Sequence, residues 1–375
     1  MSIEDFLKKY HSIKSSIFND GVDVIDLEMI NPDLPPPPQC VDALARYTFR
    51  RELHKYSVAK GLKKLRKAFS NRYSKIFSVD FDFESEICVT AGCKDGVVQA
   101  LKVLQEKLGS NSTVILPKPT YPAHISAAKF LGMNIDFFDV HKPLESFTQT
   151  HQKIVGPCIA LLNFPHNPTG INISQVEFEK FVIYASQNNI GLINDFAYGE
   201  MVYSGAGVAS SVLGFMHRKN ILEVATLSKS HSVPGWRIGA VIGDSDLIAR
   251  ISEIKSITDY GIFLPVQLAA ADALLSTERM SDDITNAYSR RANTLVRKLQ
   301  ALGWEVNMPD SGAAVWAKLP VSDVEEFLLT TLEKSGVAIS YGALYGQEYK
   351  NFVRFALVAG EARLAEAVER ISRHV

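Results

Sequence analysis

The stretch ILEVATLSKSHSVPGWRIGAVIG, residues 221–243, contains two apolar runs on either side of a polar loop. The first run, Ile221–Leu227, ends abruptly in Ser228-Lys229-Ser230, and the second, Ile238–Gly243, follows Arg237 directly. Short, continuous apolar runs bounded by turn residues are typical of strands that are buried on both faces. We therefore predict two buried strands, with a single lysine at the end of the first.

Five more apolar runs of this kind precede the quoted stretch, and helical patterns separate them. The runs are Ile87–Thr90, Thr113–Leu116, Ile135–Val140, Ile159–Phe164 and Gly191–Asp195, and the clearest helical patterns are Lys94–Leu108 and Ser174–Asn188. Alternating buried strands and helices are typical of an α/β fold with a mostly parallel sheet covered on both faces. We predict a large domain with such a seven-stranded sheet, and a ligand site beyond the carboxyl ends of its strands.

The chain changes character after the helical pattern Leu264–Ser276. A long helical pattern, Ser281–Leu302, is followed by short strand patterns and a last helix, at Trp304–Met308, Ala314–Leu319, Val337–Ser340, Phe352–Leu357 and Glu361–His374. This order indicates a second, smaller α+β domain. We predict an N-terminal segment, 1–40, that packs with the small domain, a large domain at 41–276 and the small domain at 277–375.

Composition argues against several classes of function. The 375 residues carry a formal net charge of −1, without the charge excess typical of proteins that bind nucleic acid or anionic membranes. No apolar run approaches the ~18 residues of a membrane span, and the N-terminus lacks the apolar core of a signal peptide. The four cysteines form no CxxC pair, which argues against disulfides and a zinc site. We predict a cytoplasmic protein that requires no metal.

Side chains suited to chemistry follow several of the predicted strands. They are Gly92-Cys93-Lys94, Tyr121, Asn167, Asp195 with Tyr198, Lys229 and Arg237. Each has a common structural explanation when taken alone, such as a turn, a packed ring, a helix cap or a solvated lysine. Together they indicate one site, because the carboxyl ends of parallel strands meet at one edge of a sheet. A helix beginning near Cys93 would also offer free backbone N–H groups to a phosphate.

These residues belong to longer motifs that resemble those of the class I/II aminotransferases, pyridoxal-phosphate enzymes of fold type I. The motifs are NFPHNPTG (163–170), NDFAY (194–198), TLSKSHSVPGWRIG (226–239) and FVRFAL (352–357), in the family's order and spacing. The likeness runs from Asn31-Pro32-Asp33 to the last helix. Within the family the chain is most similar to the alanine (glutamate–pyruvate) and LL-diaminopimelate branch, on SITDYGIFLPVQLAA (256–270) and VWAKLP (315–320).

The resemblance implies a role for each residue near the cofactor ring. Lys229 corresponds to the lysine that forms a Schiff base with the cofactor aldehyde, and Asp195 to the acid beside the pyridine nitrogen. Tyr198 and Asn167 correspond to the partners of the phenolic oxygen, and Tyr121 to the aromatic side chain stacked on the ring. Lys229, Asp195 and Tyr198 are therefore the implied catalytic residues.

The resemblance also implies how the two anionic groups are bound. The expected phosphate ligands are the backbone of Gly92, Cys93 and Lys94, the hydroxyls of Thr226 and Ser228, and Arg237. Tyr56 corresponds to a tyrosine that reaches the partner subunit's phosphate, which implies a homodimer with shared active sites. The N-terminal segment is expected to pack on the partner subunit as well as on the small domain. Arg354 corresponds to the arginine that binds the substrate α-carboxylate, with Asn167, Ile30 and Tyr121 beside the substrate.

The residues expected around the substrate depart from the family pattern, whereas the cofactor residues match it. The unusual residues are Glu28, Ile30, His166, Ala313, Ala314 and Tyr341. Ile30 stands where glycine is usual, and Ala313 and Ala314 stand where large side chains are common. Their concentration near the substrate indicates a reshaped pocket. One hypothesis pairs Glu28 with the distal amine of a basic amino acid.

The resemblance favours an aminotransferase that moves an amino group from an L-amino acid to a 2-oxo acid, of the alanine or glutamate type. A fold type I lyase, such as a C–S β-lyase, would use the same cofactor residues and stays open as an alternative. The alternative outside enzymes is a cofactor-binding regulatory domain. Such proteins carry a DNA-binding domain as well, and the first 30 residues are too short and not basic enough to form one.

Overall fold

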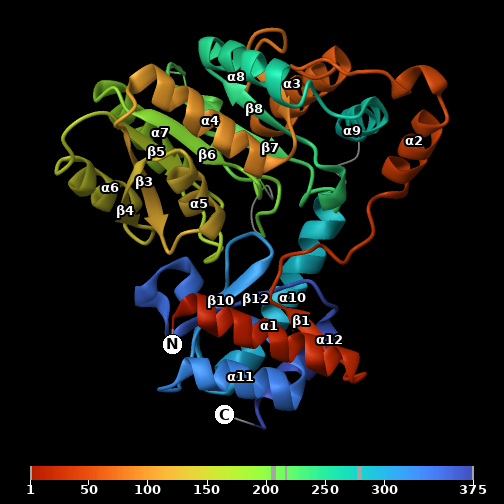
Figure 1. Ribbon diagram of the computed structural model, residues 1–375, viewed down its shortest axis with the longest axis vertical. Helices are drawn as coiled ribbons and strands as arrows, with labels where there is room; N and C mark the ends of the chain where they lie inside the picture. Colours follow the sequence, from red (N-terminus) through yellow and green to blue (C-terminus); the bar gives the residue numbers. More distant parts are fainter. Residues whose placement is uncertain (1, 204–207, 216–217, 277–280, 374–375) are drawn as a thin grey trace.

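Two β-sheets organise the computed structural model, which describes residues 2–203, 208–215, 218–276 and 281–373 (Figure 1). The larger sheet has seven strands in the order β2-β8-β7-β6-β5-β3-β4. They are β2 (Ile87–Thr90), β3 (Thr113–Lys118), β4 (Asn134–Asp139), β5 (Cys158–Leu162), β6 (Gly191–Asp195), β7 (Ile221–Thr226) and β8 (Gly239–Gly243). Of these seven, β8 alone runs antiparallel to its neighbours, so the predicted mostly parallel sheet is confirmed.

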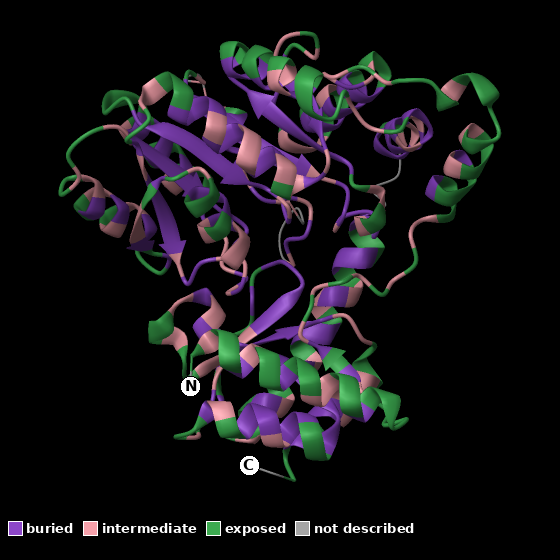
Figure 2. Ribbon diagram, viewed as in Figure 1, coloured by how far each residue is buried: buried purple, intermediate pink, exposed green. Residues whose placement is uncertain are grey.

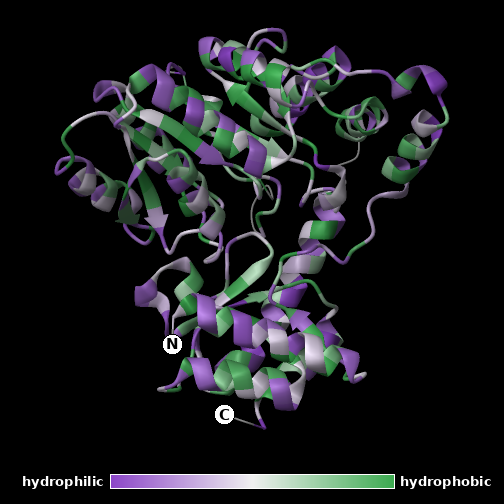
Figure 3. Cartoon of the chain, in the orientation of Figure 1, coloured by the Kyte–Doolittle hydropathy of each residue, from purple (hydrophilic) through white to green (hydrophobic). Residues whose placement is uncertain are grey.

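Alternate residues of the buried strands pack into two cores, one on each face of this sheet. On β3, Val114 and Leu116 join the core beneath α4 (Cys93–Leu108), whereas Ile115 joins the opposite core. Helices α5 (Pro122–Phe130) and α8 (Ser245–Thr258) share the face of α4, and α3 (Lys63–Phe77), α6 (Pro143–His151), α7 (Gln175–Gln187) and α9 (Leu264–Leu275) cover the other. Figures 2 and 3 show the result, a buried and largely hydrophobic sheet between helices with polar outer faces.

A five-stranded sheet forms the smaller body, in the order β1-β11-β12-β10-β9. Its strands are β1 (Ile25–Leu27), β9 (Glu305–Val306), β10 (Ala314–Lys318), β11 (Val337–Tyr341) and β12 (Phe352–Ala356). The N-terminal segment supplies β1, which pairs with β11, and α1 (Ile3–Asn19), which packs on α11 (Val324–Ser335). These contacts support the prediction that the N-terminal segment packs with the small domain, although the boundaries at residues 40 and 276 stay predictions.

The ends of several elements differ from those predicted. The strand expected at Trp304–Met308 is reduced to β9, because only two of its residues pair with β10. The long helix α10 spans Ser281–Ala301, and the last helix, α12, spans Glu361–Ile371, while the predicted end at His374 lies outside the described residues. None of the described helices is both long and apolar enough to cross a membrane.

Candidate active site

The predicted site residues meet where the large sheet faces the smaller body. Asp195 is the last residue of β6, and Lys229 follows the end of β7. Arg354 lies on β12 of the other sheet, yet its Nη1 is 3.4 Å from Oδ1 of Asn167, which follows β5. Since this contact joins residues of the two sheets, both bodies contribute to one site.

The amine of Lys229 is in a buried and electropositive environment. Its Nζ donates a hydrogen bond to the carbonyl oxygen of Ile30 at 2.7 Å. Burial lowers the pKa of Lys229 to about 8, and the nearby charges of Arg354 and Arg237 act in the same direction. The unprotonated amine is the nucleophile, so a larger fraction of Lys229 is reactive at neutral pH than of a free lysine.

Asp195 is held at the end of β6 by groups from other segments. Its Oδ2 lies 2.9 Å from Nε2 of His124 on α5, and its Oδ1 accepts a hydrogen bond from the backbone of Ala197. The ring of Tyr121 packs edge-on against His124, with the ring centroids 5.3 Å apart. His124 was not among the residues predicted from the sequence. Its three-residue spacing from Tyr121 at the start of a helix was the available signal, because such residues share a face.

The first turn of α4 forms a polar cradle, which we define as residues 91–94 with Thr226, Ser228 and Arg237. Gly92 has a φ of +80°, and a Cβ there would lie 2.7 Å from Nη2 of Arg237. This Nη2 also donates to the carbonyl oxygen of Ala91 at 2.9 Å. The hydroxyl oxygens of Thr226 and Ser228 are 2.9 Å apart. Free helix N–H groups, hydroxyls and a guanidinium fit a phosphate group, and the space is kept open by a glycine.

The strand register explains why α4 begins beside the end of β7. Gly239 of β8 pairs with Thr90 of β2 on one side and with Thr226 of β7 on the other. A Cβ on Gly239 would lie 2.9 Å from Cα of Gly92, so the glycine permits the close approach of the turn. The backbone of Cys93, the first residue of α4, is thereby brought to the same edge as the hydroxyl of Thr226.

Arg354 is a buried arginine with an unused donor. Its Nη2 donates to the carbonyl oxygen of Glu28 at 2.5 Å, and its guanidinium lies 5.3 Å from the ring centroid of Tyr345. Its Nε has no hydrogen-bond partner among the described residues. Because an unpaired buried charge is costly, this arrangement fits an anionic ligand, separate from the cradle at α4.

Comparison with known proteins identifies the family. The family described as aminotransferase class I and II matches residues 22–371. The chain belongs to this family. It is a pyridoxal-phosphate-dependent aminotransferase, and its solved structural neighbours share its fold type I architecture, as the sequence motifs predicted.

Individual relatives agree with this family assignment over nearly the whole chain. The glutamate–pyruvate aminotransferase AlaC of Escherichia coli (strain K12) is 34% identical over 367 residues, or 96% of this chain and 88% of AlaC. An LL-diaminopimelate aminotransferase of Nitratidesulfovibrio vulgaris is 27% identical over 372 residues, or 96% of this chain and 94% of that protein. Substrate-bound BacF of Bacillus subtilis superposes with a TM-score of 0.88 at 25% identity, over 100% of this chain and 95% of BacF.

Asn163 connects two predicted site residues of the aminotransferase and was also missed from the sequence. Its Nδ2 donates to the carbonyl oxygen of Asp195 at 3.0 Å, and its Oδ1 accepts from the backbone of Asn167 at 3.1 Å. Asn163 is buried directly after β5, where a single polar residue gives no pattern that indicates its partners. It fixes the separation of the ends of β5 and β6, and with it the relative positions of Asn167 and Asp195.

Most of the residues that depart from the family pattern line one narrow crevice of the aminotransferase. It is bordered by Ile30, His166, Asn167, Tyr198, Ala313 and Ala314, and in this structure it is too narrow to admit a water molecule. Burial lowers the pKa of His166 to about 3 and raises that of Tyr198 well above its usual value, so both side chains are neutral at pH 7. Tyr341 lies elsewhere, with its hydroxyl 3.4 Å from Glu325.

Two residues singled out from the sequence lie outside this arrangement. The carboxylate of Glu28 is paired with Nζ of Lys14 at 2.8 Å and with Nε2 of His11 at 3.0 Å. The charge of Glu28 is thus directed to α1, and these contacts give no support to the hypothesis that Glu28 binds a substrate amine. Tyr56 is 91% exposed, and its ring packs edge-on against Tyr260 rather than against the cleft of its own chain.

Proposed function

We propose that the enzyme transfers an amino group from an L-amino acid to a 2-oxo acid, and that its substrates are of the alanine or glutamate type. The observation that carries the proposal is the amine of Lys229, whose pKa is lowered by burial and by the charges of two arginines, Arg354 and Arg237, from separate anion sites. A phosphorylated cofactor and an amino-acid carboxylate would fill these sites. The similarity to AlaC supports the substrate class. A cytoplasmic location, expected from four scattered cysteines without a CxxC pair, stays a prediction.

The chain's own groups then divide the chemistry among them. Pyridoxal phosphate supplies, when bound, an aldehyde carbon and an electron-accepting ring. Lys229 provides the nucleophilic amine and afterwards carries the proton, because its lowered pKa suits both tasks. Asp195 would hold a negative charge beside the ring nitrogen. Tyr198 and Asn167 would hold the phenolic oxygen, and Tyr121 would lie against the ring.

The anion sites give the substrate and the cofactor fixed positions. The cradle residues Gly92, Cys93, Lys94, Thr226, Ser228 and Arg237 bind the phosphate in this proposal. Arg354 binds the α-carboxylate through its unused Nε, and Ile30 borders the substrate next to Lys229. Holding both partners reduces the entropic cost of bringing their reacting atoms together.

The absorbance of the purified protein tests this function. We expect a visible band from bound cofactor that bleaches when the amino donor is added and returns when a 2-oxo acid follows. Continuous release of pyruvate or ammonia from the amino acid, without any added 2-oxo acid, would favour the lyase. A protein that binds no pyridoxal phosphate at all would contradict the assignment of Lys229.

A homodimer with shared active sites completes the proposal. Tyr56 packs against Tyr260, and Phe49, Ile257 and Phe263 are further exposed apolar side chains. Mixing Lys229→Met chains with Tyr56→Ala chains tests the sharing. In the hybrid, one site carries both defects and the other carries none, so activity should return on mixing. Two independent sites would give no such recovery.

The lowered pKa of Lys229 predicts how the apoenzyme captures its cofactor. The capture rate should rise with pH and level off above about 8, since the reactive amine is the unprotonated form, whereas a free lysine titrates at 10.5. Removing a neighbouring cation in Arg354→Met should move the inflection to higher pH. The measurement is the rate at which the visible band forms across the neutral and alkaline range. An inflection near that of free lysine in the unmodified protein would contradict the buried environment.

The narrow crevice predicts a change in substrate preference, because Ala314 and Ile30 border it together with Asn167 and Tyr198. Ala314→Leu should crowd this side of the proposed substrate site and lower kcat/KM for amino acids with long side chains relative to alanine by roughly tenfold, the usual effect of a small change in pocket volume. Ile30→Gly should shift the preference in the opposite direction. The measurement is kcat/KM over a series of amino donors. Tyr341→Phe is the matched control, because Tyr341 also departs from the family pattern but lies away from the crevice.

A further inference from the structure

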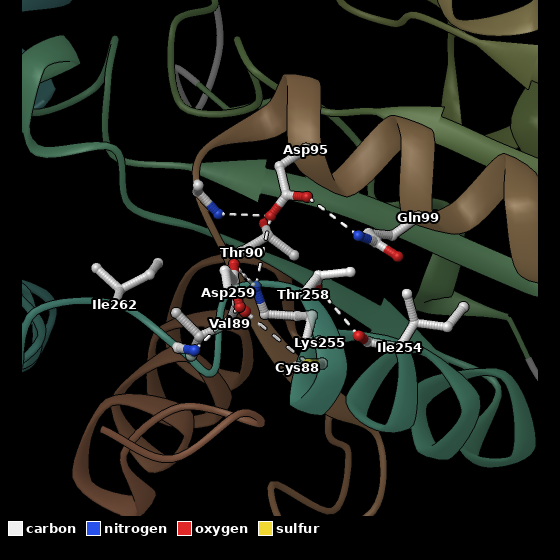
Figure 4. A network of polar contacts seen from close by, with 12 residues as sticks. Cys88, Val89, Thr90, Asp95, Gln99, Ile254, Lys255, Thr258, Asp259 and Ile262 are labelled. Atoms are coloured by element: carbon white, nitrogen blue, oxygen red, sulfur yellow. Dashed lines mark hydrogen bonds and ion pairs between the residues drawn. The ribbon is translucent and has the colours of Figure 1, made fainter. Parts of the chain in front are cut away.

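Lys255 on α8 is completely buried and reaches two carboxylates (Figure 4). Its Nζ lies 2.5 Å from Oδ2 of Asp259 and 3.6 Å from Oδ2 of Asp95. Asp259 is the C-cap of the same helix, whereas Asp95 lies in the first turn of α4. Lysine is almost never fully buried unless its charge is paired, so the position of this ammonium group is set by these two partners.

Asp95 connects Lys255 to the polar cradle. Its Oδ2 accepts a hydrogen bond from the backbone N–H of Ala91 at 2.8 Å. The carbonyl oxygen of Ala91 in turn accepts from Nη2 of Arg237 at 2.9 Å. The carboxylate of Asp95 therefore holds the backbone N–H of Ala91, and the backbone carbonyl of Ala91 holds the guanidinium of Arg237 in the cradle.

The negative charge of Asp95 is unfavourable for phosphate binding at the start of α4, and the ammonium group of Lys255 offsets it. A carboxylate in the first turn of a helix interacts favourably with the helix dipole, but it would repel a phosphate dianion bound at the same N-terminus. An ammonium group behind that carboxylate offsets the repulsion and leaves its hydrogen bond to Ala91 in place. In a buried setting water screens such charges weakly, so the effect of one neighbouring cation is large.

We propose that Lys255 is a positioning residue for cofactor binding, which fixes the cradle and neutralises Asp95 through one ion pair. This inference rests on the proposed function, because the phosphate concerned is that of the cofactor. Lys255 does not touch the cofactor in this proposal. It acts through Asp95 and Ala91, which distinguishes it from the residues that the sequence motifs assign to the phosphate.

The second carboxylate links Lys255 to the region of Tyr56. Oδ1 of Asp259 accepts from the backbone of Gly261 at 2.9 Å, and the intervening Tyr260 carries the ring that packs against Tyr56. A Cβ on Gly261, whose φ is +99°, would lie 2.5 Å from a backbone oxygen, so this turn has little freedom to move. Through Asp259, Lys255 thus supports the turn at Tyr260 that packs against Tyr56, the residue proposed to reach the partner subunit.

The test compares two cofactors on the apo form of the full chain. Lys255→Met should weaken the binding of pyridoxal phosphate by roughly tenfold, the range of a coupled charge pair, and leave the binding of pyridoxal, which lacks the phosphate, unchanged. Lys107→Met is the matched control. Lys107 joins the same two helices at their other end, where its Nζ lies 3.1 Å from Asp244, the N-cap of α8. It should alter neither dissociation constant.

A double variant separates charge neutralisation from packing. If Lys255 acts on Asp95, Lys255→Met/Asp95→Asn should recover much of the lost affinity for pyridoxal phosphate, whereas a packing role predicts a further loss. Lys255→Gln, which keeps a donor without the charge, replaces the methionine variant if that one does not fold. Equal losses for pyridoxal and pyridoxal phosphate, or no loss for either, would overturn the inference. An unmodified chain that binds neither would instead overturn the proposed function.

Discussion

Replacing Lys229 by methionine is expected to lower kcat by roughly 10⁴-fold or more, because the variant loses both the nucleophile and the proton carrier. Methionine keeps an unbranched apolar side chain of similar length, so the packing around the site should persist. The hydrogen bond from Lys229 to the carbonyl oxygen of Ile30 is lost. The measurement is steady-state turnover with saturating amino donor, 2-oxo acid and cofactor.

The same variant should still bind pyridoxal phosphate through the cradle, but dialysis should remove the cofactor. Lys107→Met serves as the control, because it removes a lysine remote from the cleft. If Lys229→Met kept turnover within about tenfold of the unmodified enzyme, another amine would have to act in its place. Lys94 lines the cleft beside Asp195 and would be the first alternative, which Lys94→Met would then test.

The large sheet could be predicted from the sequence because its strands are buried on both faces. Such strands are continuous apolar runs, and the predicted Ile221–Leu227 differs from β7 by one residue at its end. The small sheet was harder to predict. Its strand β1 has three residues and forms only because β11 lies beside it, a contact between residues more than 300 positions apart in the chain.

The site residues could be predicted where they follow strands directly. Asp195 and Lys229 need only the sheet to bring them to one edge, and the structure places them there. Their proposed chemical roles came from the family motifs, because spacing alone does not distinguish a catalytic lysine from a solvated one. Neither the strand pattern nor the family motifs could predict which partner each side chain contacts.

Partners that depend on tertiary contacts could not be predicted. His124 and Asn163 are isolated polar residues, and their contacts with Asp195 exist only once α5, β5 and β6 are packed together. Glu28 shows the same limit. Its position near Ile30 suggested a substrate contact, but its carboxylate pairs with Lys14 of α1, a contact that forms only once α1 packs beside this segment.

Asp195→Asn is expected to lower kcat by roughly a thousandfold. A charge pair at about 4 Å is worth roughly 4 kcal/mol at an effective dielectric constant near 20, and each 1.36 kcal/mol in the barrier corresponds to about tenfold in rate. Asparagine has the shape of aspartate and keeps an oxygen that can accept from Ala197. The loss should therefore report the charge beside the ring nitrogen rather than a collapse of the site.

His124→Leu distinguishes the charge of Asp195 from its orientation. This variant removes the partner of Oδ2 but leaves the carboxylate beside the ring, so its loss in kcat should be smaller, roughly tenfold, as for one buried hydrogen bond. Measuring kcat and the dissociation constant of pyridoxal phosphate for both variants separates catalysis from binding. A loss of less than about tenfold in Asp195→Asn would mean that the charge is not required. Equal losses in the two variants would mean that Asp195 acts through its position alone.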